Sequence, residues 1–424
     1  MTFLWFLVFA SSIGVTSVLF FFGLILKLLH PEAHQIKLDY SLEPSVSVLL
    51  PNFNEGEEVY NCIKSIRESN YPTDKLEIIC VDDCSVDDSY EWMKKAEAEF
   101  PNIQVHRNPT NMGKNKTVLR ALSFSKCDMV ISIDSDTIFE KDTVRELMAS
   151  FADPNMGAVG GVVGVRNVND SAFTAFQTFQ YFVAFYLGKI SENWTQTVGC
   201  ISGCLFAIRR DIYLQLHEKM EARHWFGMPT SEGEDRYLTH MVVLGGWGTY
   251  INTKARCWTT VPVTFKQYYM QQLRWRRSGL RDLFMTIRRL PDHVGINMSP
   301  MVLYVFLFFP LTTMLTLIRL GVAFLNDPLF WANPILLGSY LVIASLSTIV
   351  MKKYSPSQAI HNPLKLAMFG AWWIVNSLFL TILAICTLDY GDWGTRAKVP
   401  EPEKAPESSE TEVETLKAES AHAG

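Results

Sequence analysis

Four long apolar segments most constrain how this chain of 424 residues can fold. They are residues 3–29, 299–325, 329–350 and 364–388. A helix needs ~20 apolar residues to cross the hydrocarbon core of a bilayer, so each segment is long enough to enter a membrane. Residues 38–297 carry most of the charge, and we expect them to form a soluble domain followed by a membrane-surface segment.

The charges beside the first apolar segment predict its orientation. No basic region precedes it, as one would in a cleaved signal peptide, and Lys27, His30 and Lys37 follow it instead. Because cytoplasmic flanks are rich in Lys and Arg, we expect residues 1–37 to be a transmembrane helix and short linker with the N-terminus outside. The chain is thereby predicted to be a multi-pass protein of the plasma (cell inner) membrane with a cytoplasmic domain.

The C-terminal apolar segments, within residues 299–390, raise a conflict in topology. If residues 364–388 crossed the membrane fully, Trp393 would lie outside, away from the cytoplasmic domain. We therefore predict that this segment is re-entrant or interfacial and that the C-terminus is cytoplasmic. The tail, residues 398–424, has no aromatic residue and is predicted to be disordered.

Short apolar strands alternate with helical segments in the charged domain. The predicted strands are residues 45–51, 76–83, 103–107 and 128–136, and the helices between them are residues 55–69, 87–99 and 114–125. This alternation predicts an α/β fold with a mostly parallel sheet wrapped by helices. Ligands gather at the carboxyl ends of such strands, where the polar runs Asn52–Glu55, Asp82–Ser85 and Asp134–Asp136 lie.

Several acidic and basic residues at these strand ends suit a nucleotide site. Asp134 and Asp136 form a D-x-D that can direct two carboxylates at Mg²⁺ or Mn²⁺, which in turn binds a diphosphate. Most isolated D-x-D triplets are solvated turns, but here a strand precedes the triplet. Asp82 and Asp83 are candidates either for helix capping or for binding the N3–H of uracil. Lys114 is a candidate for phosphate or base binding, or for a solvated helix start.

Two later motifs are candidates for catalysis and acceptor binding. Asp235, in "GEDR", begins a predicted helix and is either a general base or a helix cap. Gln271, Arg274 and Trp275 share one helical face, where an indole and a guanidinium can bind a sugar ring and a phosphate. The surrounding basic segment predicts a helix on the cytoplasmic leaflet. An ordinary interfacial helix without a catalytic part is the alternative.

Taken in order, the motifs resemble a known family. "PNFNE", "VDD", "NMGK", "DSD", "GED", "QQLRW" and "DWGTR" are similar to those of the membrane-embedded family 2 glycosyltransferases, the group of hyaluronan synthase, NodC-type chitooligosaccharide synthase and chitin synthase. The resemblance implies a GT-A-type catalytic domain over residues 38–261, interfacial helices over 262–298 and a W-G-T-R gating loop at 391–397.

The resemblance also implies roles for single residues. Phe53, Glu55 and Asp83, with Asp82 beside them, would hold the uridine, and Lys114 would support uracil or phosphate. Asp134 and Asp136 would hold Mg²⁺ or Mn²⁺, with Asp134 also at the donor, and Asp235 would be the general base. Gln271, Arg274 and Trp275 would bind the acceptor end and the diphosphate, and Trp393 and Arg396 belong to the gating loop.

The function implied is processive, inverting β-glycosyl transfer from a UDP-sugar to a growing glycan that leaves through the membrane helices. UDP-GlcNAc is the favoured donor, alone or with UDP-GlcA; the other partner expected is the lipid bilayer, and no nucleic acid is expected. Relatives usually carry C-G-P or S-G-P where this chain has Ser202, Gly203 and Cys204, which leaves the sugar open. The alternatives are a non-processive enzyme with a lipid acceptor and an inactive export or assembly subunit.

Overall fold

The computed structural model describes residues 36–293, apart from 194, 195, 222 and 231, and residues 355–389, apart from 359. It also describes residues 322, 325, 326, 345 and 348–353. The predictions for the first apolar segment, for nearly all of 299–350, for Trp393 and Arg396, and for the tail therefore lie outside the described residues. Among the described helices, only α14 (Pro363–Cys386) is long and apolar enough to cross a membrane.

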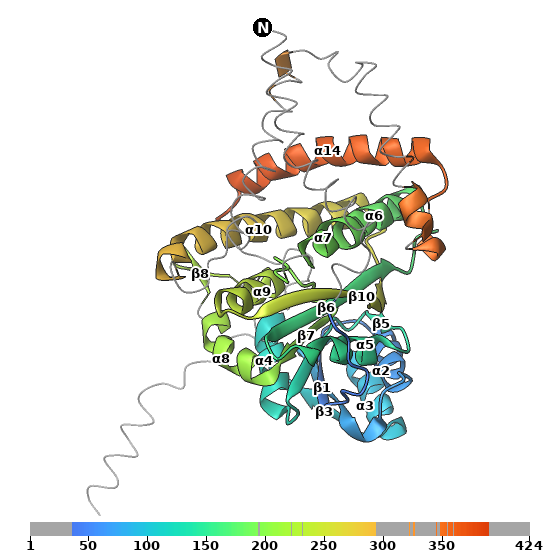
Figure 1. The fold of residues 1–424 in the computed structure, drawn as a ribbon, viewed down its shortest axis with the longest axis vertical. Helices are drawn as coiled ribbons and strands as arrows, with labels where there is room; N and C mark the ends of the chain where they lie inside the picture. The colour runs from blue at the N-terminus through green and yellow to red at the C-terminus, as the bar shows by residue number, and fades with distance from the viewer. Residues whose placement is uncertain are drawn as a thin grey trace, which may run out of the picture. The chain divides into compact units, whose positions relative to one another are not determined.

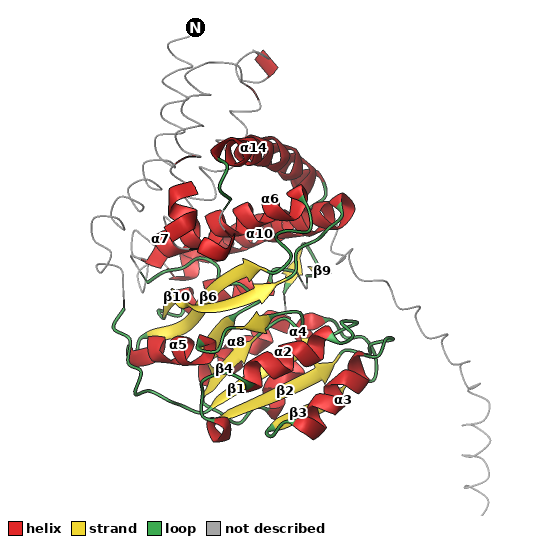
Figure 2. Ribbon diagram, turned by 90° about the vertical axis from the view of Figure 1, so that its right-hand side faces the viewer, coloured by secondary structure: helices red, strands yellow, loops and turns green. Residues whose placement is uncertain are grey.

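One mixed sheet of eight strands lies at the centre of the described residues (Figure 2). Its strand order is β3-β2-β1-β4-β7-β6-β10-β5. The strands are β1 (Val46–Asn52), β2 (Leu76–Asp82), β3 (Ile103–Arg107), β4 (Met129–Ser132), β5 (Ile138–Phe139), β6 (Met156–Val165), β7 (Phe206–Arg209) and β10 (Gly248–Thr259). A separate hairpin pairs β8 (His224–Trp225) with β9 (Met228–Pro229).

The sheet is mostly parallel, as predicted, but two of its strands, β5 and β7, run antiparallel to their neighbours. Strands β1 to β4 pair in parallel, as the alternation of strands and helices predicts. Strand β7 then runs antiparallel to both β4 and β6, and β5 runs antiparallel to β10. The long pair of β6 and β10 is parallel again. The sheet is therefore mixed, with four of its seven strand pairings parallel and three antiparallel.

The first helices bury apolar stripes against this sheet. They are α2 (Glu58–Arg67), α3 (Ser89–Glu99), α4 (Lys114–Phe124), α5 (Thr143–Ala149), α8 (Arg210–Glu221) and α9 (Glu234–Leu244), with short 3-10 turns at Thr73–Lys75, Ser150–Ala152 and Pro356–Gln358. In α4, Val118, Ala121 and Leu122 share the buried face at helical spacing. Burying one Val or Leu side chain stabilises the fold by about 1.5–3 kcal/mol. This packing fixes where the first turn of α4 begins.

Strand β6 is buried along its whole length, although four of its ten residues are glycine. The glycines allow the strand to pack closely against its neighbours, because atoms of other residues occupy the space that a side chain would fill. A Cβ on Gly160 would lie 2.5 Å from a methyl carbon of Ile201, and one on Gly161 would lie 2.4 Å from the carbonyl oxygen of Ala255. Glycine ordinarily weakens a strand, so composition alone does not predict β6.

A helical layer covers one side of the sheet (Figure 1). It contains α6 (Ala172–Phe182), a π-helical stretch (Val183–Lys189), α7 (Ile190–Glu192), α10 (Phe265–His293) and α14. Helices α10 and α14 lie side by side, and Arg276 of α10 donates to the hydroxyls of Ser377 at 2.6 Å and Thr381 at 2.7 Å. The polar residues of α14 therefore face α10.

Candidate active site

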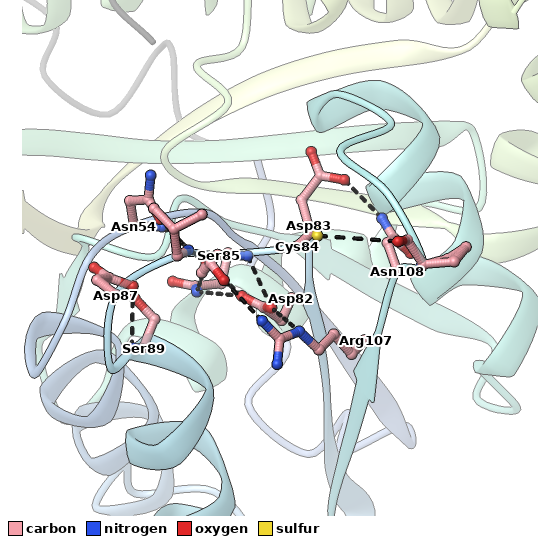
Figure 3. A network of polar contacts seen from close by, with 12 residues as sticks. Asn54, Asp82, Asp83, Cys84, Ser85, Asp87, Ser89, Arg107 and Asn108 are labelled. Carbon is pink, nitrogen blue, oxygen red and sulfur yellow. Dashed lines mark hydrogen bonds and ion pairs between the residues drawn. The ribbon is translucent and has the colours of Figure 1, made fainter. Parts of the chain in front are cut away.

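The ends of β1 and β2 meet in a network of polar contacts (Figure 3). The Asn52 amide donates to Asp82 Oδ1 at 3.1 Å, and the backbone amide of Asn54 donates to the Ser85 hydroxyl at 3.0 Å. Arg107, from the end of β3, approaches Asp82 at 3.2 Å. The expected convergence of polar strand ends is thus present for these two strands.

Asp83 shapes the loop that leads into α4. Its buried carboxylate accepts hydrogen bonds from the side chain of Asn108 and from the backbone amides of Met112 and Gly113, at 2.8, 2.8 and 2.9 Å. Gly113 has a φ of +85°, a conformation that glycine adopts readily. These contacts fix the position of Lys114, the first residue of α4.

Lys114 brings two distant acidic motifs together. Its ammonium lies 2.6 Å from Asp134 of the D-x-D and 2.8 Å from Glu234, beside the expected base. Burial by itself would lower the pKa of Lys114, but the two carboxylates outweigh it and raise that pKa well above its usual range. Lys114 is therefore held charged, and the solvated alternative for this lysine is excluded.

The two carboxylates of the D-x-D have different environments. Burial disfavours ionisation of Asp134, but the Lys114 ammonium, a hydrogen bond from the Cys204 thiol and the charge of Arg274 lower its pKa. Burial and the neighbouring Asp134 raise the pKa of Asp136 to about 6, although Thr259 donates to it at 2.9 Å. Asp134 is the more strongly acidic member of the pair.

A divalent cation fits this pair of carboxylates. Both are hard oxygen donors that follow one strand, which suits Mg²⁺ or Mn²⁺. Among the residues that the structure describes, no group of three or more His, Cys, Asp and Glu side chains gathers for a metal. Mg²⁺ in phosphate-binding sites is commonly held by one or two carboxylates together with substrate phosphates and water, and the pair Asp134 and Asp136 suits that arrangement.

Asp235 lies in the first turn of α9, where the helix dipole favours a negative charge. Its Oδ2 accepts a hydrogen bond from the backbone amide of Gly203 at 3.0 Å. Lys114, Glu234 and Asp235 line one pocket with apolar side chains such as Val118 and Leu238. The base candidate thus shares a pocket with the lysine that contacts the D-x-D.

The side chains of the Q-x-x-R-W motif lie on α10. Trp275 is 43% exposed, and its ring centroid lies 6.5 Å from that of Tyr181 on α6. The positive charge of Arg274 contributes to the lowered pKa of Asp134. The motif therefore presents an accessible aromatic ring and a cation whose charge acts on the D-x-D.

Comparisons with known proteins identify the family of this chain. Residues 47–216 match the family described as glycosyl transferase family 2. An N-acetylglucosaminyltransferase of Rhizobium leguminosarum bv. viciae is 30% identical over 84% of this chain and 82% of its own length. The chain belongs to glycosyl transferase family 2. It is therefore an enzyme that transfers sugar from a nucleotide-sugar donor, as the resemblance predicts.

Further relatives of this glycosyltransferase cover most of the chain. A hyaluronan synthase of Streptococcus pyogenes is 26% identical over 92% of both chains. A mannosyltransferase from Pyrobaculum calidifontis, solved in complex with GDP-Man and Mn²⁺, is similar in structure, with a TM-score of 0.55 and 19% identity. That likeness covers 87% of this chain and 98% of the other, and it supports the GT-A-type fold.

The structure adds residues that sequence reasoning missed. Glu234 pairs with Lys114, and the Cys204 thiol donates to Asp134 at 3.3 Å. Cys204 stands where relatives usually carry proline, and this difference was the sequence signal that could have drawn attention to it. Phe53 is buried, and the amide of Glu55 donates to Ser89 at 2.9 Å. The uridine-binding roles of Phe53 and Glu55 remain predictions.

Proposed function

We propose that this glycosyltransferase is a processive inverting enzyme that builds a β-linked glycan from UDP-GlcNAc, alone or in alternation with UDP-GlcA. The observation that carries the proposal is the contact of Lys114 with both Asp134 and Glu234. It joins a strand-end pair of carboxylates, suited to a metal and a diphosphate, to Glu234, the residue next to the candidate base Asp235. A donor and an acceptor group held by these two motifs would be close enough to react.

Each of the site residues has a separate role in the proposed reaction. Asp235 takes the proton of the acceptor hydroxyl, and that oxygen attacks the anomeric carbon of the donor from the face opposite UDP. Arg274 stabilises the charge that develops on the departing diphosphate. Mg²⁺ or Mn²⁺, when bound at Asp134 and Asp136, neutralises part of the same charge. A single displacement converts an α-linked donor into a β-linkage.

The names of the relatives support the choice of donor. The rhizobial relatives are N-acetylglucosaminyltransferases, and the streptococcal relatives are hyaluronan synthases. Trp275 supports a glycan acceptor, since an exposed indole on the helix beside the D-x-D can stack against a sugar ring. Stacking of this kind would keep the product in register between cycles.

The α10–α14 pair supports a place at the plasma membrane with the catalytic domain in the cytoplasm. Asn376 of α14 is buried and donates to Tyr268 of α10 at 3.0 Å. The exposed side chains of α14 form an apolar stripe of Leu364, Met368, Trp372, Val375, Phe379 and Ile382. One edge of this stripe borders α10, where the rings of Phe379 and Tyr269 have centroids 6.3 Å apart. A helix that turns its polar face to the protein and its apolar face outward suits an interfacial position. With the membrane helices expected outside the described residues, it would give the polymer an exit beside the site.

The donor assay that tests this proposal measures sugar incorporation and product length from purified protein in detergent with Mn²⁺. Polymer from UDP-GlcNAc alone would identify a chitin-type synthase, and dependence on both UDP-GlcNAc and UDP-GlcA would identify a hyaluronan-type synthase. A single sugar added to a lipid would contradict processivity. Transfer from neither donor would contradict the choice of UDP-GlcNAc.

A further inference from the structure

A buried cluster of charged residues joins three parts of the fold at the C-terminal half of α10. It consists of Arg223, Glu232, Arg281, Asp282 and the carbonyl group of Leu388, and we call it the arginine junction. The four charged residues are at most 3% exposed. Charged side chains are rarely buried this fully unless they are paired. Here Arg223 pairs with Asp282 and Arg281 pairs with Glu232.

Arg281 makes the central contacts of the junction. Its Nη1 donates to Glu232 Oε2 at 2.9 Å, in the loop that precedes α9. Its Nε and Nη2 both donate to the carbonyl oxygen of Leu388 at 3.2 and 3.0 Å, just beyond the end of α14. One planar guanidinium therefore binds two segments at once, as its fixed fork of donors allows.

The neighbouring contacts hold the same loop against α10. Arg223 donates to Asp282 at 3.2 Å and to the carbonyl oxygen of Glu232 at 2.9 Å. Gly233 follows with a φ of +70°, and a Cβ at this position would lie only 1.7 Å from the hydroxyl of Ser278 on α10. The backbone at residues 232 and 233 therefore rests directly on the helix that carries the Q-x-x-R-W motif.

We propose that Arg281 is a positioning residue, which fixes the loop bearing Glu234 and Asp235 relative to α10 and to the end of α14. Asp235 lies two residues after Gly233, so a shift of this loop also moves the carboxylate of Asp235. Arg281 itself acts through Glu232 and lies outside the donor contacts. The catalytic part of this inference rests on the proposed role of Asp235 as the base.

The variants are chosen to separate positioning from simple stabilisation. Arg281→Met alone leaves Glu232 buried without its partner and is expected to destabilise the protein. The double variant Arg281→Met with Glu232→Gln removes both charges, so its melting temperature should recover most of this loss, the remainder reflecting the hydrogen bonds to the Leu388 carbonyl. Arg276→Met is the matched control, because it removes two hydrogen bonds to α14 without touching the loop before α9.

Hydrogen exchange of the full chain in detergent tests the positioning without any substrate. We expect the amides of residues 232–237 to exchange roughly tenfold faster in the double variant than in the wild type or in Arg276→Met. Exchange at the wild-type rate in the double variant would overturn the inference. Should the double variant fail to fold, Arg281→Lys is measured in its place, since it keeps the charge but loses the planar fork.

Kinetics then test the consequence for the base. A displacement of Asp235 should lower kcat about 10- to 100-fold. The KM for the UDP-sugar should change far less, because Asp134 and Asp136 lie outside the displaced loop, which meets Asp134 through Lys114. A double variant with restored stability and wild-type kcat would show that Arg281 is merely structural, and the inference would be wrong. A wild type that transfers no sugar would instead contradict the proposed function, and hydrogen exchange would still decide the positioning.

Discussion

Replacing Lys114 with methionine should destabilise the site by leaving two carboxylates without their shared cation. Removing one partner from a buried ion pair costs about 3–5 kcal/mol. The Lys114 side chain is 11% exposed, but that of Asp134 is 33% exposed, so we expect the lower end of this range, about 3 kcal/mol. At ~2–4 °C per kcal/mol for a domain of this size, the melting temperature should fall by roughly 6–12 °C.

Thermal unfolding of purified Lys114→Met, first without divalent cations and then with Mn²⁺, measures this loss. Mn²⁺ at Asp134 and Asp136 would supply positive charge in place of the ammonium, so we expect it to restore part of the lost stability. Lys116→Met is the control, because Lys116 lies on the same helix and is exposed. A melting temperature for Lys114→Met within about 2 °C of the control would refute the argument, since it would show that Lys114 carries little of the pairing energy.

Three further predictions concern the metal, the base loop and pH. Asp136→Asn removes one expected metal ligand, so UDP release should need roughly tenfold more Mn²⁺, and an unchanged Mn²⁺ titration would contradict the metal role. Gly233→Ala should lower the melting temperature more than Gly113→Ala does. Both glycines have a positive φ, but only a Cβ at position 233 would clash with Ser278. Equal falls in melting temperature would disprove the close contact. Burial raises the pKa of Asp282 to about 6, so the folded state binds this proton more tightly than the unfolded chain. The wild type should therefore lose stability relative to Asp282→Asn as pH rises from about 4 to 6, by up to about 3 kcal/mol. A difference in stability between the two proteins that does not change with pH would show that Asp282 does not titrate between about pH 4 and 6.

The parallel half of the fold could be predicted because local sequence determines it. Strands β1 to β4 begin and end within a few residues of their predicted ranges, since each is a short apolar run bounded by polar residues. Strand β6 could not be predicted because its glycines are favoured by contacts with residues 40 to 95 positions away, such as Ile201 and Ala255. The antiparallel place of β7 likewise depends on pairing across the sheet.

The candidate site shows the same division between local and distant information. Asp134, Asp136 and Asp235 stand out as motifs at the ends or beginnings of expected elements. The contact of Lys114 with Glu234 could not be seen in sequence, because 120 positions separate residues that only the fold brings within 2.8 Å. Arg281 was also inconspicuous among the basic residues of α10. Arg277 is buried as well, and the contacts of Arg281 with Glu232 and Leu388 distinguish it.

The most direct test of the account is UDP release by Asp235→Asn and by the wild type from UDP-GlcNAc with Mn²⁺, with UDP-GlcA present in a parallel reaction. The substitution keeps the size of the side chain and removes its ability to take a proton. The account predicts UDP release and product from the wild type and a loss of about 100-fold or more in the variant, since general base catalysis contributes about 10²–10⁴-fold. Equal rates of UDP release would contradict the role of Asp235 and the mechanism built around it.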